Sequence, residues 1–228
     1  MNTKLILFSH YYVNDEIINR FNNLKKLNPT WDIISIGFEG YKLLDNSITT
    51  NKEIYPSNKD LHYFALYQHL DWFDGDLFLY DVYQKFPNYN EYFLYEYDTI
   101  CNVSIDSFFD TSLDFFGSTI CNPGREDWDW IKLYRKHNIY NTRFEKLYSC
   151  GQTTAIYFKN NILKQCVNEL FENKYLYNNM FSEVRCGTLV SQFTSLKMGN
   201  PNNNKFISWI QNDINVDENI HHFYHPVK

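Results

Sequence analysis

Tyr92-Phe93-Leu94-Tyr95-Glu96-Tyr97-Asp98-Thr99 is an apolar and aromatic run with two carboxylates at its far end. Its first residues are typical of a buried β-strand. Successive strand side chains point to opposite faces, so we expect Glu96 and Asp98 to share a face. Because unpaired buried charge is costly, the acids belong at the carboxyl end of the strand, where the chain leaves the sheet.

This position favours a ligand site over the alternative of a solvated loop, although acid-x-acid triplets are common. Open α/β sheets bind ligands beyond the carboxyl ends of their strands. Two carboxylates there suit a hard divalent cation, Mg²⁺ or Mn²⁺. Such a cation could in turn hold a diphosphate.

The beginning of the chain predicts a βαβ unit. A continuous apolar run at residues 4–10 indicates a buried first strand. Asn14 is expected to cap a helix over residues 16–27, and residues 31–38 form a second strand parallel to the first. We therefore expect an α/β fold of Rossmann-like type, with a mixed, mostly parallel central sheet flanked by helices.

The ends of these two strands supply candidate nucleotide ligands. Ser9, His10 and Tyr11 end the first strand, although His10 is equally explained as an ordinary strand-end residue. Tyr11 or Phe38 is suited to stack on a base, and Glu39 to accept from a base N–H or a ribose hydroxyl. Because the first strand is not followed by GxGxxG, a dinucleotide cofactor of the usual type is disfavoured.

Further elements follow from the hydrophobic periodicity of the rest of the chain. Residues 41–58 are polar and read as a loop, with a short strand near Ile54-Tyr55. Helices are expected at 61–72, 77–86, 160–171 and 182–197, strands at 113–120, 153–158 and 206–210, and a loop at 121–136.

Three further acids have both a structural and a functional explanation. Asp76 either complements the dipole of the helix that follows it or faces the nucleotide. Glu183 opens a helix that we expect Ser182 to cap, where an acid is likewise favoured. Asp129 lies in Asp127-Trp128-Asp129-Trp130, a pattern suited to a sugar or, alternatively, to the packing of a lid.

Composition excludes several classes of protein. The 228 residues include 44% hydrophobic residues, enough for the core of one α/β domain. The net charge of −6, without a dense Lys/Arg cluster, argues against a nucleic-acid partner. Five cysteines without a CxxC pair predict reduced thiols and a cytoplasmic location. We expect neither a signal peptide nor a membrane span.

The tail His221-His222-Phe223-Tyr224-His225-Pro226-Val227-Lys228 holds three of the seven histidines. A histidine that completes the coordination of a metal on Asp98 is chemically sound for Mn²⁺. We therefore expect the tail to fold back over the carboxyl edge of the sheet. The alternative is that these histidines lie on a loose end.

Taken together, these features resemble a GT-A glycosyltransferase over nearly the whole chain. The resemblance rests on the βαβ unit, on Trp72-Phe73-Asp74-Gly75-Asp76, on the strand that ends in Glu96 and Asp98, on Ser182-Glu183, and on His225-Pro226-Val227-Lys228. The chain is most similar to small viral and bacterial transferases that build surface or capsid glycans. The resemblance implies a single domain, with a nucleotide-sugar half at 1–100 and an acceptor half with a metal-binding tail at 101–228.

The resemblance also implies roles for individual residues. Asp98 matches the last position of the family's Asp-x-Asp motif, whereas Glu96 departs from its first position. His225 would be a further metal ligand, beside Asp98 and Glu96, and Lys228 would assist at the diphosphate. Glu183, or else Asp129, would be the general base of an inverting enzyme.

The implied reaction moves a sugar from a nucleoside diphosphate sugar, UDP-linked by preference, to a hydroxyl of a glycan acceptor. Its cofactor would be Mn²⁺ or Mg²⁺, and its partners would include other glycosyltransferase domains. Two alternatives stay open. One is a sugar-1-phosphate nucleotidyltransferase, which is disfavoured because residues 9–15 are neither Gly-rich nor basic. The other is a glycan-binding module without turnover.

Overall fold

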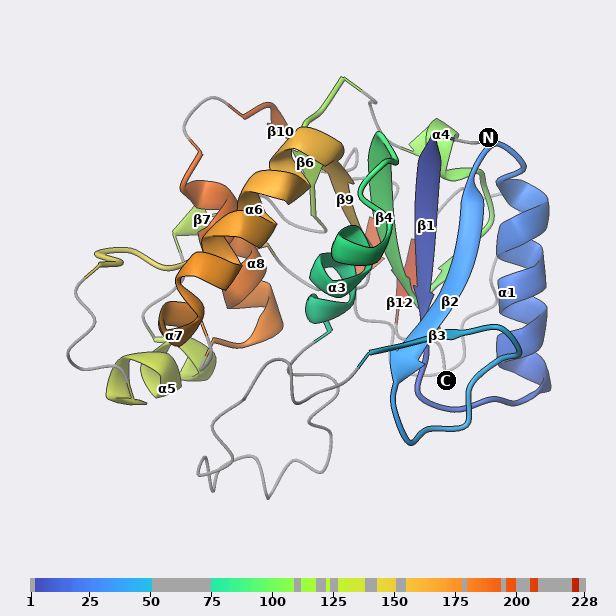
Figure 1. Cartoon of the computed structure of the whole chain (residues 1–228), viewed down its shortest axis with the longest axis horizontal. Coiled ribbons are helices and arrows are strands. Elements are labelled where there is room, and N and C mark those ends of the chain that lie inside the picture. Colours follow the sequence, from blue (N-terminus) through green and yellow to red (C-terminus); the bar gives the residue numbers. More distant parts are fainter. Residues whose placement is uncertain are drawn as a thin grey trace.

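The computed structural model describes residues 3–50, 75–108, 112–117, 122–123, 127–137, 143–150, 155–177, 180–193, 196–199, 206–208 and 223–225. Its strands are β1 (Lys4–Ser9), β2 (Asp32–Phe38), β3 (Ile48–Thr50), β4 (Glu91–Glu96), β5 (Ile100–Cys101), β6 (Phe115–Phe116), β7 (Asn122–Pro123), β8 (Tyr148–Ser149), β9 (Ala155–Lys159), β10 (Met198–Gly199), β11 (Phe206–Ser208) and β12 (Phe223–His225). Its helices are α1 (Asp15–Leu27), α3 (Leu77–Lys85), α4 (Ile105–Phe108), α5 (Asp129–His137), α6 (Asn160–Glu172), α7 (Lys174–Tyr177) and α8 (Ser182–Ser191). Figure 1 shows these elements around one central sheet.

The central sheet has seven strands in the order β10-β6-β9-β4-β1-β2-β3. β1 pairs in parallel with β2 and with β4, whereas β9 runs antiparallel to both of its neighbours, β4 and β6. The predicted mixed, mostly parallel α/β sheet is therefore confirmed, together with the parallel pairing of the first two strands. The continuous apolar runs of β1 and β4 explain why these two strands lie in the middle, where helices cover both faces.

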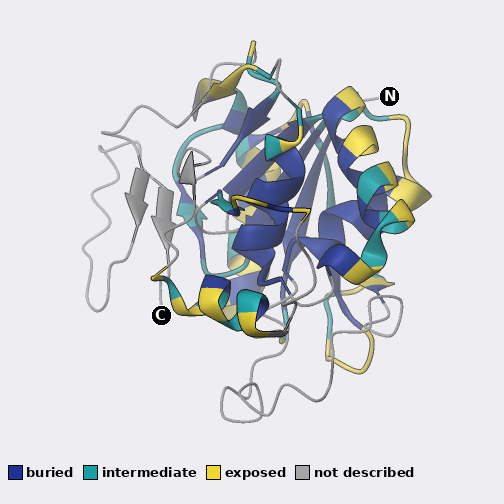
Figure 2. Ribbon diagram, turned by 90° about the vertical axis from the view of Figure 1, so that its left-hand side faces the viewer, coloured by how far each residue is buried: buried dark blue, intermediate teal, exposed yellow. Residues whose placement is uncertain are grey.

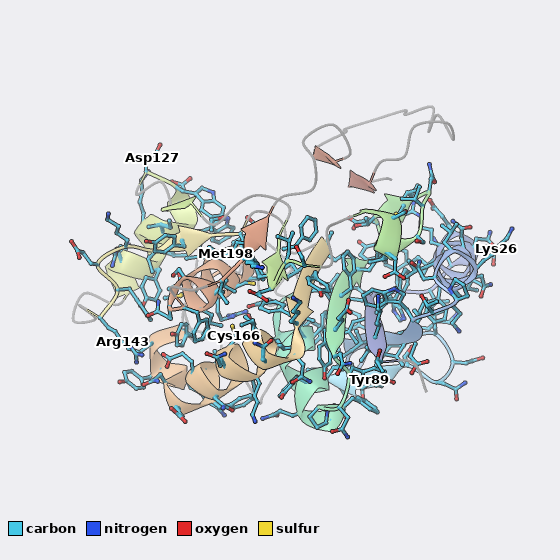
Figure 3. All side chains as sticks on the ribbon, turned by 90° about the horizontal axis from the view of Figure 1, so that it is seen from above. Lys26, Tyr89, Asp127, Arg143, Cys166 and Met198 are labelled. Carbon is cyan, nitrogen blue, oxygen red and sulfur yellow. The ribbon has the colours of Figure 1, made fainter. Side chains whose placement is uncertain are left out.

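Alternation along β1 directs its side chains into two separate cores. Leu7 belongs to the cluster that also contains side chains of α3, α6 and α8, and Phe8 belongs to the cluster that contains side chains of α1. Figure 2 shows the buried residues concentrated between these layers. From above, Cys166 of α6 and Lys26 of α1 lie on opposite sides of the strands (Figure 3). No helix among the described residues is long and apolar enough to cross a membrane.

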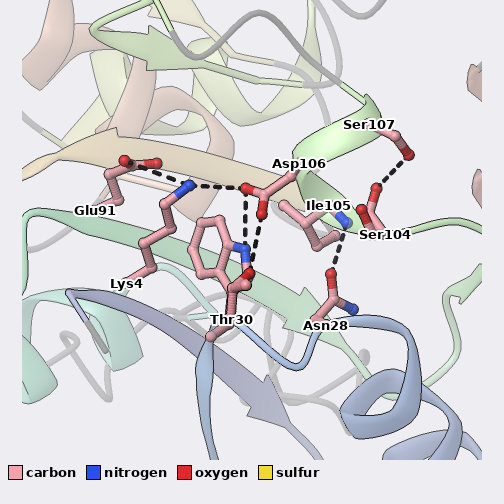
Figure 4. Close-up of polar contacts among 9 residues, drawn as sticks. Lys4, Asn28, Thr30, Glu91, Ser104, Ile105, Asp106 and Ser107 are labelled. Carbon is pink, nitrogen blue, oxygen red and sulfur yellow. Dashed lines mark hydrogen bonds and ion pairs between the residues drawn. The ribbon is translucent and has the colours of Figure 1, made fainter. Parts of the chain in front are cut away.

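The amino edge of the sheet is closed by a polar network (Figure 4). Asp106 of α4 accepts hydrogen bonds from Lys4 Nζ at 2.8 Å and from Trp31 Nε1 at 3.1 Å. Burial by itself would raise the pKa of Asp106, but these hydrogen bonds hold it below its usual value. Nearby, the Asn28 side chain accepts from the backbone N–H of Ile105 at 2.6 Å. Structural polar contacts thus occupy the amino edge, opposite the edge where β1 and β4 end.

The tail forms part of a second sheet with the order β11-β12-β5. β12 pairs antiparallel with β5, with Tyr224 opposite Ile100 and Phe223 opposite Cys101. Because β5 follows the acidic turn almost directly, the tail strand runs beside the segment that leaves β4. Residues 223–225 thus return to the segment after the acidic turn, the other tail residues lie outside the described part of the chain, and the metal role of His225 stays a prediction.

Several elements differ from the sequence prediction. The loop predicted at 121–136 contains α5, whose Ile131 and Tyr134 are buried at helical spacing, a signal that the paired tryptophans obscured. The loop predicted at 41–58 contains β3, which is too short to show periodicity. α8 ends at Ser191 rather than near residue 197, and Ser182 is its first helical residue, after Phe181 as N-cap. The strand near Ile54-Tyr55 and the helix at 61–72 lie outside the described residues.

Candidate functional site

Ser9 and Glu96 mark the carboxyl edge of the sheet. They are register partners at the ends of β1 and β4, and Tyr97 N donates to Ser9 O at 2.9 Å just beyond them. By alternation from Leu7 and Leu94, which pack in the core that contains α3, both side chains face the α3 side. Glu96 therefore lies at the strand end where the sequence places it.

Asp98 lies in a turn rather than in the strand. β4 ends at Glu96, and Thr99 N donates to Glu96 O at 3.0 Å to close the turn. The predicted strand to Asp98 is thus two residues too long, and strand alternation does not decide which face Asp98 occupies. Asp98 is partly exposed where the chain leaves the sheet, whereas Glu96 is buried.

A cation from α1 fixes this turn. Arg20 Nη1 donates to Tyr97 O at 2.8 Å, and the same guanidinium forms an ion pair with Glu16 one helical turn earlier. A charged donor on the central carbonyl of the turn restrains the position of both acids. Sequence reasoning missed Arg20, because a helical surface arginine carries no sign of a partner so distant in the chain.

The tail strand comes next to the acidic turn. Continuing the pairing of β12 with β5 by one residue brings the backbone of His225 opposite Thr99, the neighbour of Asp98. No group of three or more His, Cys, Asp or Glu side chains among the described residues could hold a metal ion. The carboxylates of Glu96 and Asp98 are oxygen donors that fit Mg²⁺ or Mn²⁺, and they need a further ligand. The backbone of His225 lies beside this turn, whereas Lys228 lies outside the described residues.

Aromatic rings cover the same edge of the sheet. Tyr11 stacks on Phe38 with ring centres 6.3 Å apart and meets Tyr97 edge-on at 5.6 Å. Phe38 is only 1% exposed, so it has no open face for a base, and the expectation that it stacks on one is wrong. Tyr11 is partly exposed, and Tyr12 and Tyr41 are exposed. The accessible aromatic surface at this edge therefore comes from tyrosines rather than from Phe38.

The His10 ring lies on the other face of the sheet, with Phe8. Its Nε2 lies 3.5 Å from Leu44 N and 3.4 Å from Ser47 Oγ, and burial lowers its pKa to about 4. The neutral ring thus supports the loop after β2 and does not share the face of Ser9. Glu39 is exposed, and its backbone N–H donates to Thr50 O at 3.1 Å.

Asp76 is buried and paired rather than open to a ligand. Its side chain is 0% exposed, and its two carboxylate oxygens accept from Arg185 Nε at 3.0 Å and from Arg185 Nη2. Burial raises the pKa of Asp76, and the charge of Arg185 opposes that rise. Asp76 is the N-cap residue of α3, the helix start where the dipole favours an acid, but its carboxylate makes no capping hydrogen bond and is closed to a nucleotide in this structure. Sequence reasoning missed Arg185, because the pair joins residues far apart in the chain.

The two candidate bases have opposite environments. Glu183, in the first turn of α8, is 9% exposed, and its carbonyl accepts from Cys150 N at 3.2 Å. Asp129 begins α5 with a side chain that is 80% exposed and paired with Lys132 at 3.2 Å. Trp130 stacks on Phe181, the N-cap of α8, with ring centres 4.6 Å apart. Trp130 therefore has a packing contact within the structure, whereas its role in a lid stays a prediction.

No family model and no curated protein sequence matches the chain. Among solved structures, it is similar to a glycosyltransferase involved in the glycosylation of the major capsid of PBCV-1. That match has 13% identity, covers 87% of this chain and 82% of that one, and has a TM-score of 0.43. The chain is also similar to mouse xyloside xylosyltransferase 1 in its apo form, at 10% identity, with 89% and 86% of the two chains covered and a TM-score of 0.44. At such low TM-scores neither similarity decides the activity, which has to be argued from the residues of this chain.

Proposed function

We propose that the protein is a metal-dependent glycosyltransferase that moves a sugar from a UDP-linked donor to a hydroxyl of a glycan acceptor. The observation that carries the proposal is the carboxyl edge of the sheet. There the paired ends of β1 and β4 are followed by an acidic turn that Arg20 restrains and that the tail strand flanks. Ligands of open α/β sheets bind at this edge.

In this proposal, Asp98 and Glu96 would hold Mn²⁺ or Mg²⁺ together with His225. When bound, such a cation would supply positive charge opposite the leaving diphosphate. Asp98 is the principal ligand, because it is the more exposed of the two acids. Lys228 assists at the diphosphate.

The donor binds along the same edge of the sheet. Tyr11 and its exposed neighbour Tyr12 offer ring faces or edges for the base. Ser9 is only 1% exposed, so its hydroxyl lies beneath this surface on the α3 side and is not open to the donor. Glu39, exposed at the end of β2, accepts from a ribose hydroxyl or a base N–H. His10 belongs to the support of this site rather than to its surface, because its ring is buried against Leu44 and Ser47.

The acceptor half comprises residues 101–228, with Glu183 as general base and Asp129 as the second candidate. Glu183 is preferred as the base because its carboxylate is buried, and exclusion of water strengthens its interaction with the reacting hydroxyl. Glu183 would take the proton of the acceptor hydroxyl as that oxygen bonds to the anomeric carbon of the donor and the bond from that carbon to the departing UDP breaks. This role applies to an inverting enzyme, and a retaining one requires no such base.

Donor turnover tests the proposal. The purified protein is incubated with a panel of nucleotide sugars, with and without Mn²⁺, and release of the nucleoside diphosphate is followed. We expect Mn²⁺-dependent hydrolysis of at least one UDP-sugar, and loss of that hydrolysis in Asp98→Ala. Asp106→Asn, at the opposite edge of the sheet, is the matched control and should keep it.

Two other outcomes would contradict the proposal. Nucleotide-sugar breakdown that requires pyrophosphate would indicate a nucleotidyltransferase. Binding of glycans without turnover of any donor, in the presence of Mn²⁺, would indicate a binding module.

A further inference from the structure

α8 is attached to α3 by a buried ion pair between the two halves of the chain. Arg185 Nε lies 3.0 Å from Asp76 Oδ2, and Arg185 Nη2 contacts Asp76 Oδ1. The remaining nitrogen, Nη1, donates to Met180 O at 3.0 Å, just before α8 begins. All three guanidinium nitrogens therefore have an acceptor, and both side chains of the pair are almost wholly buried.

The opposite side of α8 is held just as closely. A Cβ on Gly187 would lie 2.8 Å from backbone atoms of Tyr148, Ser149 and Cys150, so only glycine allows this approach. Cys150 N donates to Glu183 O at 3.2 Å, and Thr188 Oγ1 accepts from Tyr148 N at 3.1 Å. The first turns of α8 are thus fixed between the start of α3 and the β8 segment.

Stability by itself is a weak explanation for such a pair. The free energy of removing two charges from water cancels much of their electrostatic attraction. A well-packed pair of apolar side chains is therefore often at least as stabilising. A bidentate Arg–carboxylate contact does fix how the two side chains lie relative to each other, because both hydrogen bonds constrain the orientation of the guanidinium. The structure that this geometry fixes is the beginning of α8, two residues from Glu183.

We propose that Asp76 and Arg185 are positioning residues that set the location of Glu183 for proton abstraction from the acceptor. The inference rests on the proposed function, in which Glu183 is the base. It assigns Asp76 a role other than binding of the donor. Placement of a reacting group matters because an error of about 1 Å can cost roughly 10²-fold in rate.

The α3 helix offers a matched control. Asp81, on α3 itself, is a second buried carboxylate, and it accepts from Thr50 Oγ1 at 2.8 Å and from Lys85 Nζ at 2.7 Å. Unlike Asp76, it contacts β3 and its own helix rather than α8. Asp81→Asn should therefore destabilise the protein through a lost ion pair without moving Glu183.

The experiment compares Asp76→Asn with Asp81→Asn at a temperature well below the Tm of both variants. Three quantities are measured: Tm, the affinity for UDP with Mn²⁺, and kcat and KM for a donor that the wild type turns over. We expect Tm to fall in both variants. Only in Asp76→Asn should kcat fall, by about tenfold or more, while UDP affinity and donor KM stay unchanged within about twofold.

A second variant keeps the inference testable if Asp76→Asn does not fold. Asp76→Asn combined with Arg185→Gln replaces the ion pair by two neutral amides that can still hydrogen-bond and leaves no unpaired charge. The double variant should fold and should again lose kcat at constant UDP affinity. Arg185→Lys keeps the charge but loses the bidentate contact, so its kcat should lie between that of the double variant and that of the wild type.

Three results would overturn the inference. A fall in UDP affinity in Asp76→Asn would make Asp76 a donor ligand. Equal kcat in Asp76→Asn and Asp81→Asn would make the pair merely structural. Full activity in Glu183→Gln, with activity lost in Asp98→Ala, would refute the inference but leave the proposed function standing. Full activity in Asp98→Ala would refute the proposed metal site itself.

Discussion

Ser9 and Glu96 are register partners at the ends of two adjacent parallel strands, and both side chains face the layer that contains α3. Beyond them the chain enters a turn in which Asp98 is partly exposed and which Arg20 holds through the Tyr97 carbonyl. The donor site that we propose is an extension of this pair of strand ends.

Removal of the Arg20 side chain should weaken the metal site without unfolding the protein. Arg20→Ala deletes the charged hydrogen bond to Tyr97 O, and such bonds contribute about 1.5–3 kcal/mol. We expect affinity for UDP with Mn²⁺ to fall about tenfold, because the turn must then be ordered on binding. Calorimetry measures the change, with Glu16→Gln as the control that leaves Arg20 in place. Equal affinities in all three proteins would show that the turn does not depend on Arg20.

Glu183 should affect transfer far more than donor binding. Glu183→Gln keeps the size of the side chain but removes the base, and loss of a general base costs roughly 10²–10⁴ in rate. Steady-state kinetics with donor and acceptor separate kcat from donor KM. The matched variant Asp129→Asn changes an exposed acid and should leave kcat unchanged. If Asp129→Asn is the slow variant instead, the assignment of the base is reversed.

His10 should make the protein less stable in mild acid. Its folded pKa of about 4 lies below the ordinary 6.5, so the unfolded chain binds a proton that the folded chain does not. Stability is therefore full above about pH 6.5 and falls as the pH drops toward 4, by at most about 3 kcal/mol. Urea unfolding between pH 7 and pH 4 measures this loss.

His10→Gln is the control for that titration. The variant should be less stable at pH 7, because the amide packs less well, but it should show a smaller loss between pH 6.5 and 4. An identical pH dependence in the variant and the wild type would mean that His10 does not cause it.

The tail should be needed for the metal site but not for the fold. The backbone of β12 runs beside the segment that follows the acidic turn, and its pairing leads His225 toward Thr99. Deletion of residues 223–228 removes His225 and Lys228 together. We expect a folded protein without Mn²⁺-dependent affinity for UDP and without turnover. Wild-type affinity after truncation would refute the role of the tail, and Asp98 would then need other partners.

His225→Ala separates the histidine from the rest of the tail. It should reproduce the loss of Mn²⁺ dependence while leaving β12 in place, because the pairing of β12 with β5 uses the backbone.

The sequence predicts the central fold because local signals and burial agree there. The apolar runs of β1 and β4 show as continuous hydrophobic stretches, and Asn14 caps α1 through its hydrogen bond to Ile17 N at 2.9 Å. Glu96 is placed at a strand end for the same reason, since an acid cannot continue an apolar run into the core.

What the sequence does not predict depends on contacts between distant residues. Asp76 does stand at a helix start, as its sequence context suggests, but its pairing with Arg185, more than a hundred residues later, cannot be seen in the sequence. His10 follows Ser9, but alternation places the two side chains on opposite faces of the sheet. Only the packing shows that Ser9 lies on the α3 side and that the His10 ring lies on the other side. Arg20 likewise shows its role only through Tyr97.

The most direct test of the account is calorimetry of UDP binding with and without Mn²⁺, for the wild type and for Asp98→Ala, with Asp106→Asn as control. We predict that Mn²⁺ is required for tight binding in the wild type and in Asp106→Asn. Asp98→Ala should keep its fold, as judged by circular dichroism, but lose the Mn²⁺-dependent binding. Unchanged affinity in Asp98→Ala would contradict the assignment of the metal site, and with it the proposed mode of donor binding.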